Sequence, residues 1–223
     1  MQGNSAPVTS SQVQAHEGLH ALVERHAAHA YRKPVAPYNR SAFESSIARW
    51  RACGSAPLIL DAGCGVGLST LHLAAQFPDH FVIGVDQSAD RIARNTHWDG
   101  VRPDNFLWVR ADLVDYWRLM QQAGIRPVRH YVLYPNPWPK IGQVQRRWHG
   151  HPVFPTVVAL GGHFECRSNW DIYIDECSSA LIQLSGRSVQ SGRYVTDLPI
   201  TPFESKYLES GHALWRCTAT LET

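Results

Sequence analysis

The sequence has no long hydrophobic run. No stretch approaches the roughly 20 consecutive apolar residues that a membrane-spanning helix needs. The first twelve residues, MQGNSAPVTSSQ, lack the basic start and the apolar stretch of a secretory signal. We therefore expect a protein without membrane spans that works in the cytoplasm.

Cysteine is scarce and scattered. The five cysteines are Cys53, Cys64, Cys166, Cys177 and Cys217. None forms a Cys-x-x-Cys pair, no zinc-binding spacing appears, and an odd count in a chain of this length argues against a disulfide framework. We expect no metal site, and the usage fits a reducing compartment.

An excess of charge of one sign is also missing. The 21 Lys and Arg residues almost balance 19 Asp and Glu residues, for a formal charge of +2, and only 18% of residues are charged. This balance leaves no strong electrostatic footprint for nucleic acid, although 12 histidines can add charge near phosphates. With 44% hydrophobic residues, the 223-residue chain can build a full-sized core.

The chain divides into a short tail, a pair of helices and one domain. Residues 1–12 are polar and rich in Ser, Gln and Pro, which is typical of a flexible tail. Residues 13–54 read as N-terminal helices, because small and apolar residues recur at near-helical spacing. Residues 55–223 show neither a linker nor an internal repeat, so we assign them to a single domain.

The two N-terminal helices have recognisable limits. The first is predicted over residues 13–33 and ends before Pro34. The second is predicted over residues 39–53, where Ser41 and Glu44 have the spacing of a capping box.

From residue 57 onward, short apolar runs alternate with helical patterns. This alternation predicts a Rossmann-like, doubly wound α/β fold with a mostly parallel sheet and helices on both faces. The predicted strands are residues 57–65, 80–86, 105–112 and 128–139, and the helices between them are residues 67–78, 88–98 and 113–124. Downstream we expect a helix end and a strand within residues 155–169, a helix at 170–184, a loop at 185–194, a helix at 201–211 and a strand at 212–222.

A glycine-rich turn, LDAGCGVG, follows the first predicted strand. Gly63, Gly65 and Gly67 can take positive φ and let a ligand approach the backbone. A lone turn of this kind is a weak signal, because dinucleotide-binding folds use a similar one and ordinary turns also contain glycine. The ligand therefore has to be inferred from the residues at the ends of the neighbouring predicted strands.

Acidic residues end three successive predicted strands. Asp61, just before the turn, suits a ligand with an ammonium group better than a phosphate. Asp86, about 20 residues on, is placed to accept hydrogen bonds from ribose hydroxyls, and Asp112 is placed for an adenine edge. Ammonium, ribose and adenine together describe S-adenosylmethionine. The alternatives are NAD, disfavoured by Asp61 and by Gly-x-Gly-x-Gly spacing, and plain helix-capping aspartates.

At this point the sequence resembles the Rossmann-like S-adenosylmethionine-dependent methyltransferases. The stretches LDAGCGVG, GVDQS and RAD are similar to that class's first three motifs. The resemblance implies S-adenosyl-L-methionine as cofactor and adds Gln87, within GVDQS, to the cofactor-binding residues. Those residues are then Asp61, Gly63, Gly65, Gly67, Asp86, Gln87, Asp112 and Asn136.

The motif YPNPWPK, residues 134–140, and the later TPFE narrow the resemblance. Three prolines in five positions stiffen the loop and forbid a helix. A Pro-Trp-Pro-Lys loop, a basic run and a Thr-x-Phe-Glu motif in this order resemble the bacterial tRNA (guanine-N7)-methyltransferases. That family implies Asn136 as the catalytic loop residue and tRNA as the partner. It implies substrate binding by Trp138, Lys140, Asn169, Thr201 and Glu204.

The chain departs from that family at the acceptor pocket. Asn136 and Asn169 stand where the family has acids, and the basic run KIGQVQRR is thin, leaving Lys140, Arg146 and Arg147 for phosphates. An amide both donates and accepts, so it fits a base edge that carries an acceptor, such as adenine N1 or a carbonyl, better than a carboxylate does. A small heterocyclic acceptor, another base, or a non-catalytic binding module therefore stay open. The sequence does not choose between a monomer and a homodimer.

Overall fold

The structure is a computed structural model that describes residues 4–94 and 96–221. Residues 1–3, which belong to the predicted tail, lie outside the described part. The chain forms two compact units, residues 33–132 and residues 1–32 with 133–223. We call the first the glycine-loop unit and the second the proline-loop unit, and we describe each by itself.

The glycine-loop unit alternates strands and helices. Its elements are α2 (Pro37–Ala52), β1 (Leu58–Ala62), α3 (Leu68–Gln76), β2 (Phe81–Asp86), α4 (Ala89–Ile92), β3 (Phe106–Arg110), α5 (Leu113–Gln122) and β4 (Arg129–Leu133), whose last residue is counted with the other unit. The β1 strand pairs in parallel with β2 and β4, and β2 pairs in parallel with β3. The carboxyl ends of these strands therefore lie at one edge of the sheet.

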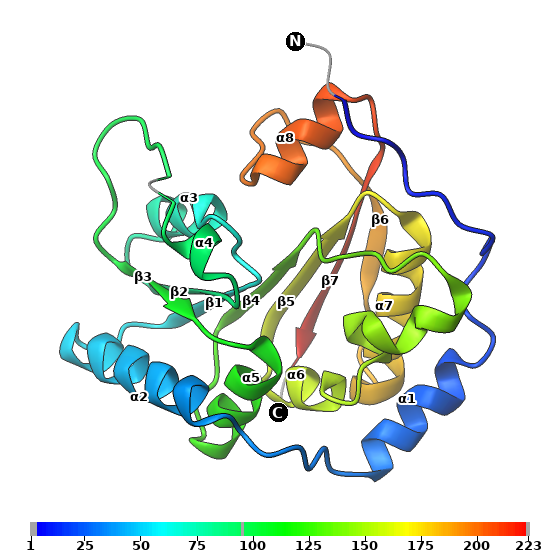
Figure 1. The fold of residues 1–223 in the computed structure, drawn as a ribbon, viewed down its shortest axis with the longest axis horizontal. Helices are drawn as coiled ribbons and strands as arrows, with labels where there is room; N and C mark the ends of the chain where they lie inside the picture. Colours follow the sequence, from blue (N-terminus) through cyan, green and yellow to red (C-terminus); the bar gives the residue numbers. More distant parts are fainter. Residues whose placement is uncertain (1–3, 95, 222–223) are drawn as a thin grey trace. The chain divides into compact units, whose positions relative to one another are not determined.

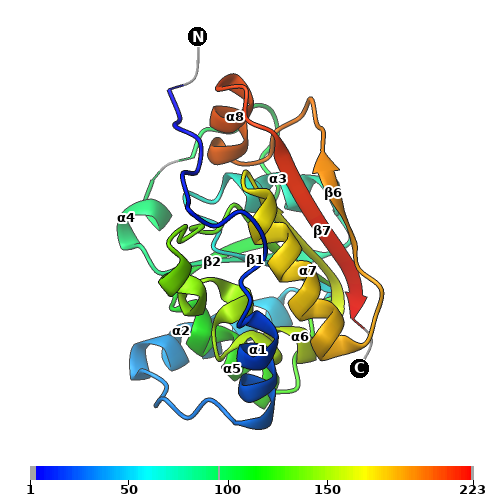
Figure 2. The same ribbon diagram turned by 90° about the vertical axis from the view of Figure 1, so that its right-hand side faces the viewer.

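The core of this unit follows from its apolar strands. Every residue of β1 and β2 is buried, as expected for parallel strands covered on both faces. Helices α3 and α4 lie on one side of these strands, and α2 and α5 lie on the other (Figures 1 and 2).

The proline-loop unit is built on an antiparallel sheet. Its elements are α1 (Leu19–Ala28), the 3₁₀ helices η1 (Ile141–Arg146) and η2 (Trp148–Gly150), α6 (Phe154–Ala159), β5 (Gly162–Ser168), α7 (Asp171–Ser185), β6 (Gln190–Tyr194), α8 (Pro202–Glu209) and β7 (Leu214–Leu221). The β7 strand pairs with both β5 and β6. The long helix α7 packs along this sheet and against α1 (Figure 2).

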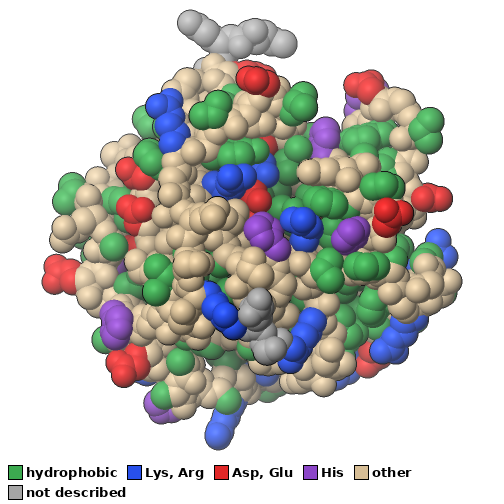
Figure 3. All heavy atoms as spheres, turned by 180° about the vertical axis from the view of Figure 1, so that it is seen from behind, with side chains coloured by type: hydrophobic (Ala, Val, Ile, Leu, Met, Phe, Trp, Pro, Cys, Tyr) green, Lys and Arg blue, Asp and Glu red, His purple; other side chains and the backbone are tan. Residues whose placement is uncertain are grey.

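The strand order is β3-β2-β1-β4-β5-β7-β6. This seven-stranded, mostly parallel sheet with flanking helices confirms the predicted Rossmann-like α/β fold. No helix in the described residues is long and apolar enough to cross a membrane. On the face drawn in Figure 3, Lys and Arg side chains are mixed with acidic, histidine and hydrophobic ones.

Four local predictions were wrong. The α2 helix begins at Pro37, so Ser41 and Glu44 lie inside it and form no capping box; Pro at the first helical position already suits the helix start. The α1 helix covers only Leu19–Ala28 of the predicted 13–33.

The other two errors concern α4 and β6. The α4 helix has four residues instead of the predicted eleven, and residue 95 of the predicted span lies outside the described part of the chain. None of the four residues is buried, so little burial stabilises a longer helix. Residues 190–194 form a strand inside the predicted loop 185–194. Their Ser, Gly and Arg composition is typical of loops, and the pairing with β7 overrides it.

Candidate functional site

The glycine turn connects β1 to α3 in a left-handed backbone conformation. Gly63, Gly65 and Gly67 have φ values of 84°, 59° and 83°, which glycine adopts without steric cost. The Gly63 amide donates to the Val85 carbonyl oxygen at 2.8 Å, which ties the turn to the end of β2. A Cβ built on Gly65 meets no atom within 4 Å, so space is open above the middle of the turn.

Gly67 has a different environment. A Cβ at this position would lie 2.3 Å from Nε1 and 2.4 Å from Cε2 of Trp108, on the neighbouring part of β3. The indole therefore packs directly on the backbone of the turn, and Gly67 is required for this contact as well as for its positive φ.

The Asp86 carboxylate closes onto the turn. One oxygen accepts from the Gly65 amide at 3.1 Å and the other from the Ser88 amide at 2.8 Å. Arg91 adds an ion pair through Nη1 at 3.4 Å, with its own side chain half exposed. The structure thus brings two predicted cofactor-binding residues, Asp86 and Gly65, into direct contact.

Asp61 is buried beneath the turn, in β1. Its Oδ2 accepts from the Ser69 and Thr70 hydroxyls, both at 2.7 Å, in the first turn of α3. Burial raises the pKa of Asp61 to about 6, although these two hydrogen bonds work in the opposite direction. A Cβ on Gly84, paired with Asp61 across the strands, would lie 2.2 Å from the Thr70 hydroxyl, so glycine at 84 leaves room for it.

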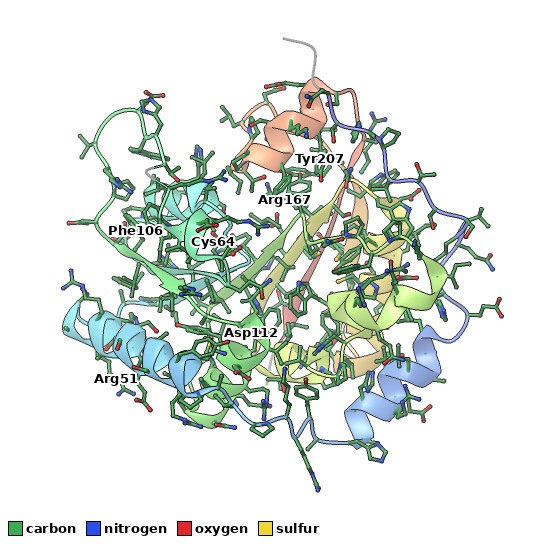
Figure 4. All side chains as sticks on the ribbon, in the orientation of Figure 1. Arg51, Cys64, Phe106, Asp112, Arg167 and Tyr207 are labelled. Atoms are coloured by element: carbon green, nitrogen blue, oxygen red, sulfur yellow. The ribbon has the colours of Figure 1, made fainter. Side chains whose placement is uncertain are left out.

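Two further predicted cofactor residues of this unit, Gln87 and Asp112, follow β2 and β3. Gln87 follows β2 with an exposed side chain. Asp112 is the N-cap of α5: its Oδ1 accepts from the Val114 amide at 2.8 Å, and its own amide donates to Asn39 Oδ1 at 3.0 Å. The capping role foreseen as an alternative is therefore present for Asp112. Figure 4 labels Asp112 at the start of α5 and Cys64 within the glycine turn.

In the other unit, the loop after β4 turns twice through left-handed conformations. Tyr134 and Trp138 have φ values of 51° and 45°, unusual for large side chains. Asn136 is exposed, and its Oδ1 accepts from the Trp138 amide at 3.2 Å in an Asx turn. The Arg146 guanidinium lies over the Trp138 ring, 4.8 Å from its centroid.

The basic side chains after the loop have separate environments. Lys140 is exposed. Arg147 is fully buried and donates through Nε and Nη2 to the Trp138 carbonyl oxygen, at 3.2 and 3.1 Å. The expectation that Arg147 meets phosphates was therefore wrong, because its guanidinium is fully engaged inside the unit.

Thr201 and Glu204 are placed at the start of α8. The Thr201 hydroxyl accepts from the Glu204 amide at 2.9 Å, which makes Thr201 the N-cap. Glu204 is fully buried. One of its oxygens accepts from the Tyr134 hydroxyl at 2.6 Å and from Arg167 Nη1 at 2.9 Å, and the other accepts from the Ile200 amide at 2.7 Å. In this geometry Glu204 has a structural role.

Asn169 lies beyond the end of β5. Its Nδ2 is 3.3 Å from Nδ1 of His212, and His212 stacks on Tyr207 with the rings 13° from parallel. Since the amide nitrogen faces this imidazole, Asn169 Oδ1 is the atom that can accept from a ligand.

Sequence reasoning missed two residues that organise this part of the proline-loop unit. Tyr134 donates to Glu204, and burial together with that carboxylate raises its pKa well above the usual range. Arg167 bridges Glu204 and Glu165, the latter at 2.6 Å. A signal was present for Arg167, because Glu165 and Arg167 are two residues apart in a predicted strand and share one face. Figure 4 labels Arg167 on β5 and Tyr207 on α8.

Metal ligation has no support in the described residues. No group of three or more His, Cys, Asp or Glu side chains there is arranged to hold a metal ion.

Comparison with known proteins shows similarity to methyltransferases. A family described as "Putative methyltransferase" matches residues 55–217. A tRNA (guanine-N(7)-)-methyltransferase of Polaromonas sp. is 27% identical over 177 residues, which cover 72% of this chain and 69% of the relative. The enzyme of the same description from Zymomonas mobilis is 28% identical over 172 residues, covering 71% and 72%.

Among solved structures, the 16S rRNA (adenine(1408)-N(1))-methyltransferase of Catenulisporales acidiphilia has a TM-score of 0.55 and 17% identity. The match covers 79% of this chain and 93% of that one. At this identity the likeness concerns the fold.

Proposed function

The chain belongs to the family described as "Putative methyltransferase", and from this premise we propose that it transfers a methyl group from S-adenosyl-L-methionine to N7 of a guanine in tRNA. The observation that carries the proposal is that one chain contains both a glycine turn closed by Asp86 and a Pro/Trp loop held in left-handed turns, each within its own unit. Relatives described as tRNA (guanine-N(7)-)-methyltransferases support the acceptor. A tRNA substrate would place the enzyme in the cytoplasm.

The glycine-loop unit would hold the cofactor. The open space above Gly65 fits a ligand against the turn backbone. Asp86 would accept hydrogen bonds from ribose hydroxyls, with Gln87 beside it. Asp61 would contribute through its ionised form above about pH 6, and Asp112 through its place at the end of β3. Gly63 and Gly67 would keep the turn in shape.

When bound, S-adenosylmethionine supplies an electrophilic methyl group on a sulfonium. Guanine N7 already has an in-plane lone pair, so no side chain has to remove a proton. The task of the protein is to place the acceptor nitrogen about 3 Å from the methyl carbon and to exclude water. A loop stiffened by three prolines limits the positions open to the acceptor.

The proline-loop unit would hold the acceptor. Asn136 and Asn169 would offer amide oxygens to the N1–H and N2–H₂ donors of guanine, in place of the family's carboxylates. Trp138 would stack on the base, and Lys140 would meet a phosphate. Thr201 and Glu204 would act indirectly, because Glu204 holds Tyr134 from its buried position.

The test is a tritiated-methyl transfer assay on unmodified tRNA, with the modified nucleoside identified by mass spectrometry. We expect 7-methylguanosine. Trp138→Ala should reduce transfer without changing cofactor affinity in calorimetry, whereas Asp86→Asn should weaken cofactor binding itself. Cofactor binding without label on any tRNA would reject the tRNA substrate.

A second candidate is methylation of a small heterocycle or of another base. It is favoured by the neutral amides Asn136 and Asn169 and by the mixed charges on the face in Figure 3, where basic residues form no continuous path among the described side chains. Label transferred to small heterocycles but not to tRNA would favour it. Failure to bind S-adenosylmethionine at all would instead indicate a non-catalytic module.

A further inference from the structure

A buried cluster lies beneath the proline loop. It consists of Arg147, Glu176, His149 and Gln12, and we call it the Arg147 cluster. Arg147 Nη1 and His149 Nε2 lie 2.6 and 2.7 Å from the same oxygen of Glu176. Arg147 Nη2 donates to Gln12 Oε1 at 2.9 Å. The Arg147, His149 and Glu176 side chains are completely buried.

Every polar group of Glu176 is engaged. Its other oxygen accepts from Gln12 Nε2 at 2.6 Å and from the His16 amide at 2.9 Å. Burial alone would raise the pKa of Glu176, but the hydrogen bond from His149 and the Arg147 guanidinium lower it to about 2. Burial lowers the pKa of His149, although the contact with Glu176 works in the opposite direction; its Nε2 lies 2.7 Å from Glu176 Oε2.

A buried ion pair is stable only when its remaining donors and acceptors are also hydrogen-bonded, because an unpaired charge in the core is strongly destabilising. The hydrogen bonds of the cluster also fix Arg147 in one orientation. The guanidinium stacks over the Trp170 ring at 4.8 Å. Arg147 directs two N–H groups at the Trp138 carbonyl oxygen.

Trp138 is the strained point of the loop. A large residue at φ 45° needs support from its surroundings, because side chains other than glycine rarely adopt this conformation. Arg147 holds its carbonyl, and Asn136 holds its amide. Ser10 donates a further short hydrogen bond to the Pro139 carbonyl oxygen. The N-terminal segment thus reaches the loop directly through Ser10 and indirectly through Gln12.

We propose that Arg147 is a positioning residue that holds the 136–140 loop in the arrangement needed for methyl transfer, and that Gln12 completes its support. This inference rests on the proposed function. Arg147 touches neither cofactor nor acceptor; it acts through the Trp138 carbonyl. Residues 10–12, at the end of the predicted tail, thereby become part of the acceptor side of the enzyme.

Two variants test the proposal: one changes Arg147 itself, and the other changes only the residue that supports it. Arg147→Lys keeps a positive charge for Glu176 but loses the planar fork that reaches Trp138 and Gln12 together. Gln12→Ala removes only the outer support and keeps the test valid if the lysine variant does not fold. Arg51→Lys, on the exposed surface of α2 in the other unit, is the matched control.

The first readout is hydrogen–deuterium exchange of residues 134–140, which needs no substrate. We expect faster exchange in Arg147→Lys and Gln12→Ala and unchanged exchange in the control. Unchanged exchange in the folded variants would overturn the proposal. The exchange rates do not depend on which acceptor the enzyme uses. If the wild-type protein fails to methylate tRNA, the proposed function is rejected, but the exchange rates still test whether Arg147 holds the loop.

The second readout is kinetic. We expect kcat to fall between about tenfold and a hundredfold in Arg147→Lys, while the dissociation constant for S-adenosylmethionine stays the same. In a Trp138→Ala background the same change should have a much smaller effect, since both residues act through one loop. Full additivity, or an unchanged kcat together with faster exchange, would overturn the positioning role.

Discussion

At the scale of single residues, the candidate site depends on backbone conformations that few side chains adopt. The glycine turn uses three glycines at positive φ, as a turn of this kind requires. The proline loop instead places Tyr134 and Trp138 in the left-handed region. Glycine could not replace either residue without loss of a contact. The Tyr134 hydroxyl donates to Glu204, and the Trp138 ring lies under the Arg146 guanidinium.

Gly67 gives a first prediction. Gly67→Ala puts a Cβ 2.3 Å from Trp108 Nε1 at a positive φ, so we expect a loss of about 2–4 kcal/mol in the free energy of unfolding. Urea denaturation measures it. Gly65→Ala, which has open space around its Cβ, should cost only about 1 kcal/mol. Equal losses in the two variants would contradict the packing argument, and Trp108→Ala should relieve part of the Gly67→Ala defect.

Asp61 gives a second. Its folded pKa, raised to about 6 from 3.8, means that the native state binds the proton more tightly than the unfolded chain. The corresponding stability is fully present below pH 3.8 and is lost as the pH rises through 6. Asp61→Asn lacks this titration. Its stability relative to the wild type should therefore improve by about 2 kcal/mol between pH 4 and pH 7, measured by urea denaturation at both pH values. A difference independent of pH would show that Asp61 does not titrate in this range.

At the scale of elements, the first residues of α2 and α8 show that a local sequence pattern does not by itself fix where a helix begins. The sequence pattern Ser-x-x-Glu at Ser41 predicted a cap, but α2 begins four residues earlier at Pro37. The pattern Thr-x-x-Glu at Thr201 was interpreted as a substrate site, and in the structure it caps α8. The same local spacing thus has two outcomes, because the position of the helix within the fold decides which residue comes first.

These two positions form a matched pair of substitutions. Thr201→Ala should destabilise the protein by about 1 kcal/mol, since it leaves the Glu204 amide without its acceptor. Ser41→Ala should change the stability by less than about 0.5 kcal/mol, because Ser41 lies within α2 and caps nothing. Thermal denaturation of both variants decides the point. A larger loss of stability in Ser41→Ala than in Thr201→Ala would show that Ser41 caps α2, as the sequence pattern predicted.

At the scale of the whole molecule, buried histidines set the response to acid. Burial lowers the pKa of His130 to about 3, and Trp117 donates its indole N–H to His130 Nε2 at 3.0 Å. In the unfolded chain His130 binds a proton near pH 6.5, whereas in the folded protein it stays neutral down to about pH 3. The contribution of the neutral ring to the free energy of unfolding is therefore fully present above pH 6.5 and is lost as the pH falls toward 3. Burial lowers the pKa of His149 as well, and its effect has the same sign.

We therefore expect His130→Gln, which keeps an acceptor for Trp117, to lose less stability than the wild type between pH 6.5 and pH 5. The difference should be about 2 kcal/mol, measured by urea denaturation at the two pH values. The Asp61 titration has the opposite sign, so the comparison is best made in an Asp61→Asn background. Equal acid sensitivity with and without His130 would show that its ring is charged in the fold.

The sequence alone determined the alternation of strands and helices in residues 57–133, the positions of the glycine turn and the proline loop, and the methyltransferase resemblance, which the family match confirms. These features depend on local periodicity and on residues whose backbone limits are intrinsic, namely glycine and proline.

Only the tertiary structure decided which charged side chains are exposed. Arg147 and Glu204 were predicted to bind ligands, but both are buried. Arg147 pairs with Gln12 and Glu176, and Glu204 pairs with Tyr134 and Arg167; these partners come from distant parts of the chain. Pairing with β7 likewise made a strand of residues 190–194. The physical reason is the same in each case: a buried charge or an edge strand is stable only with partners that no local pattern reveals.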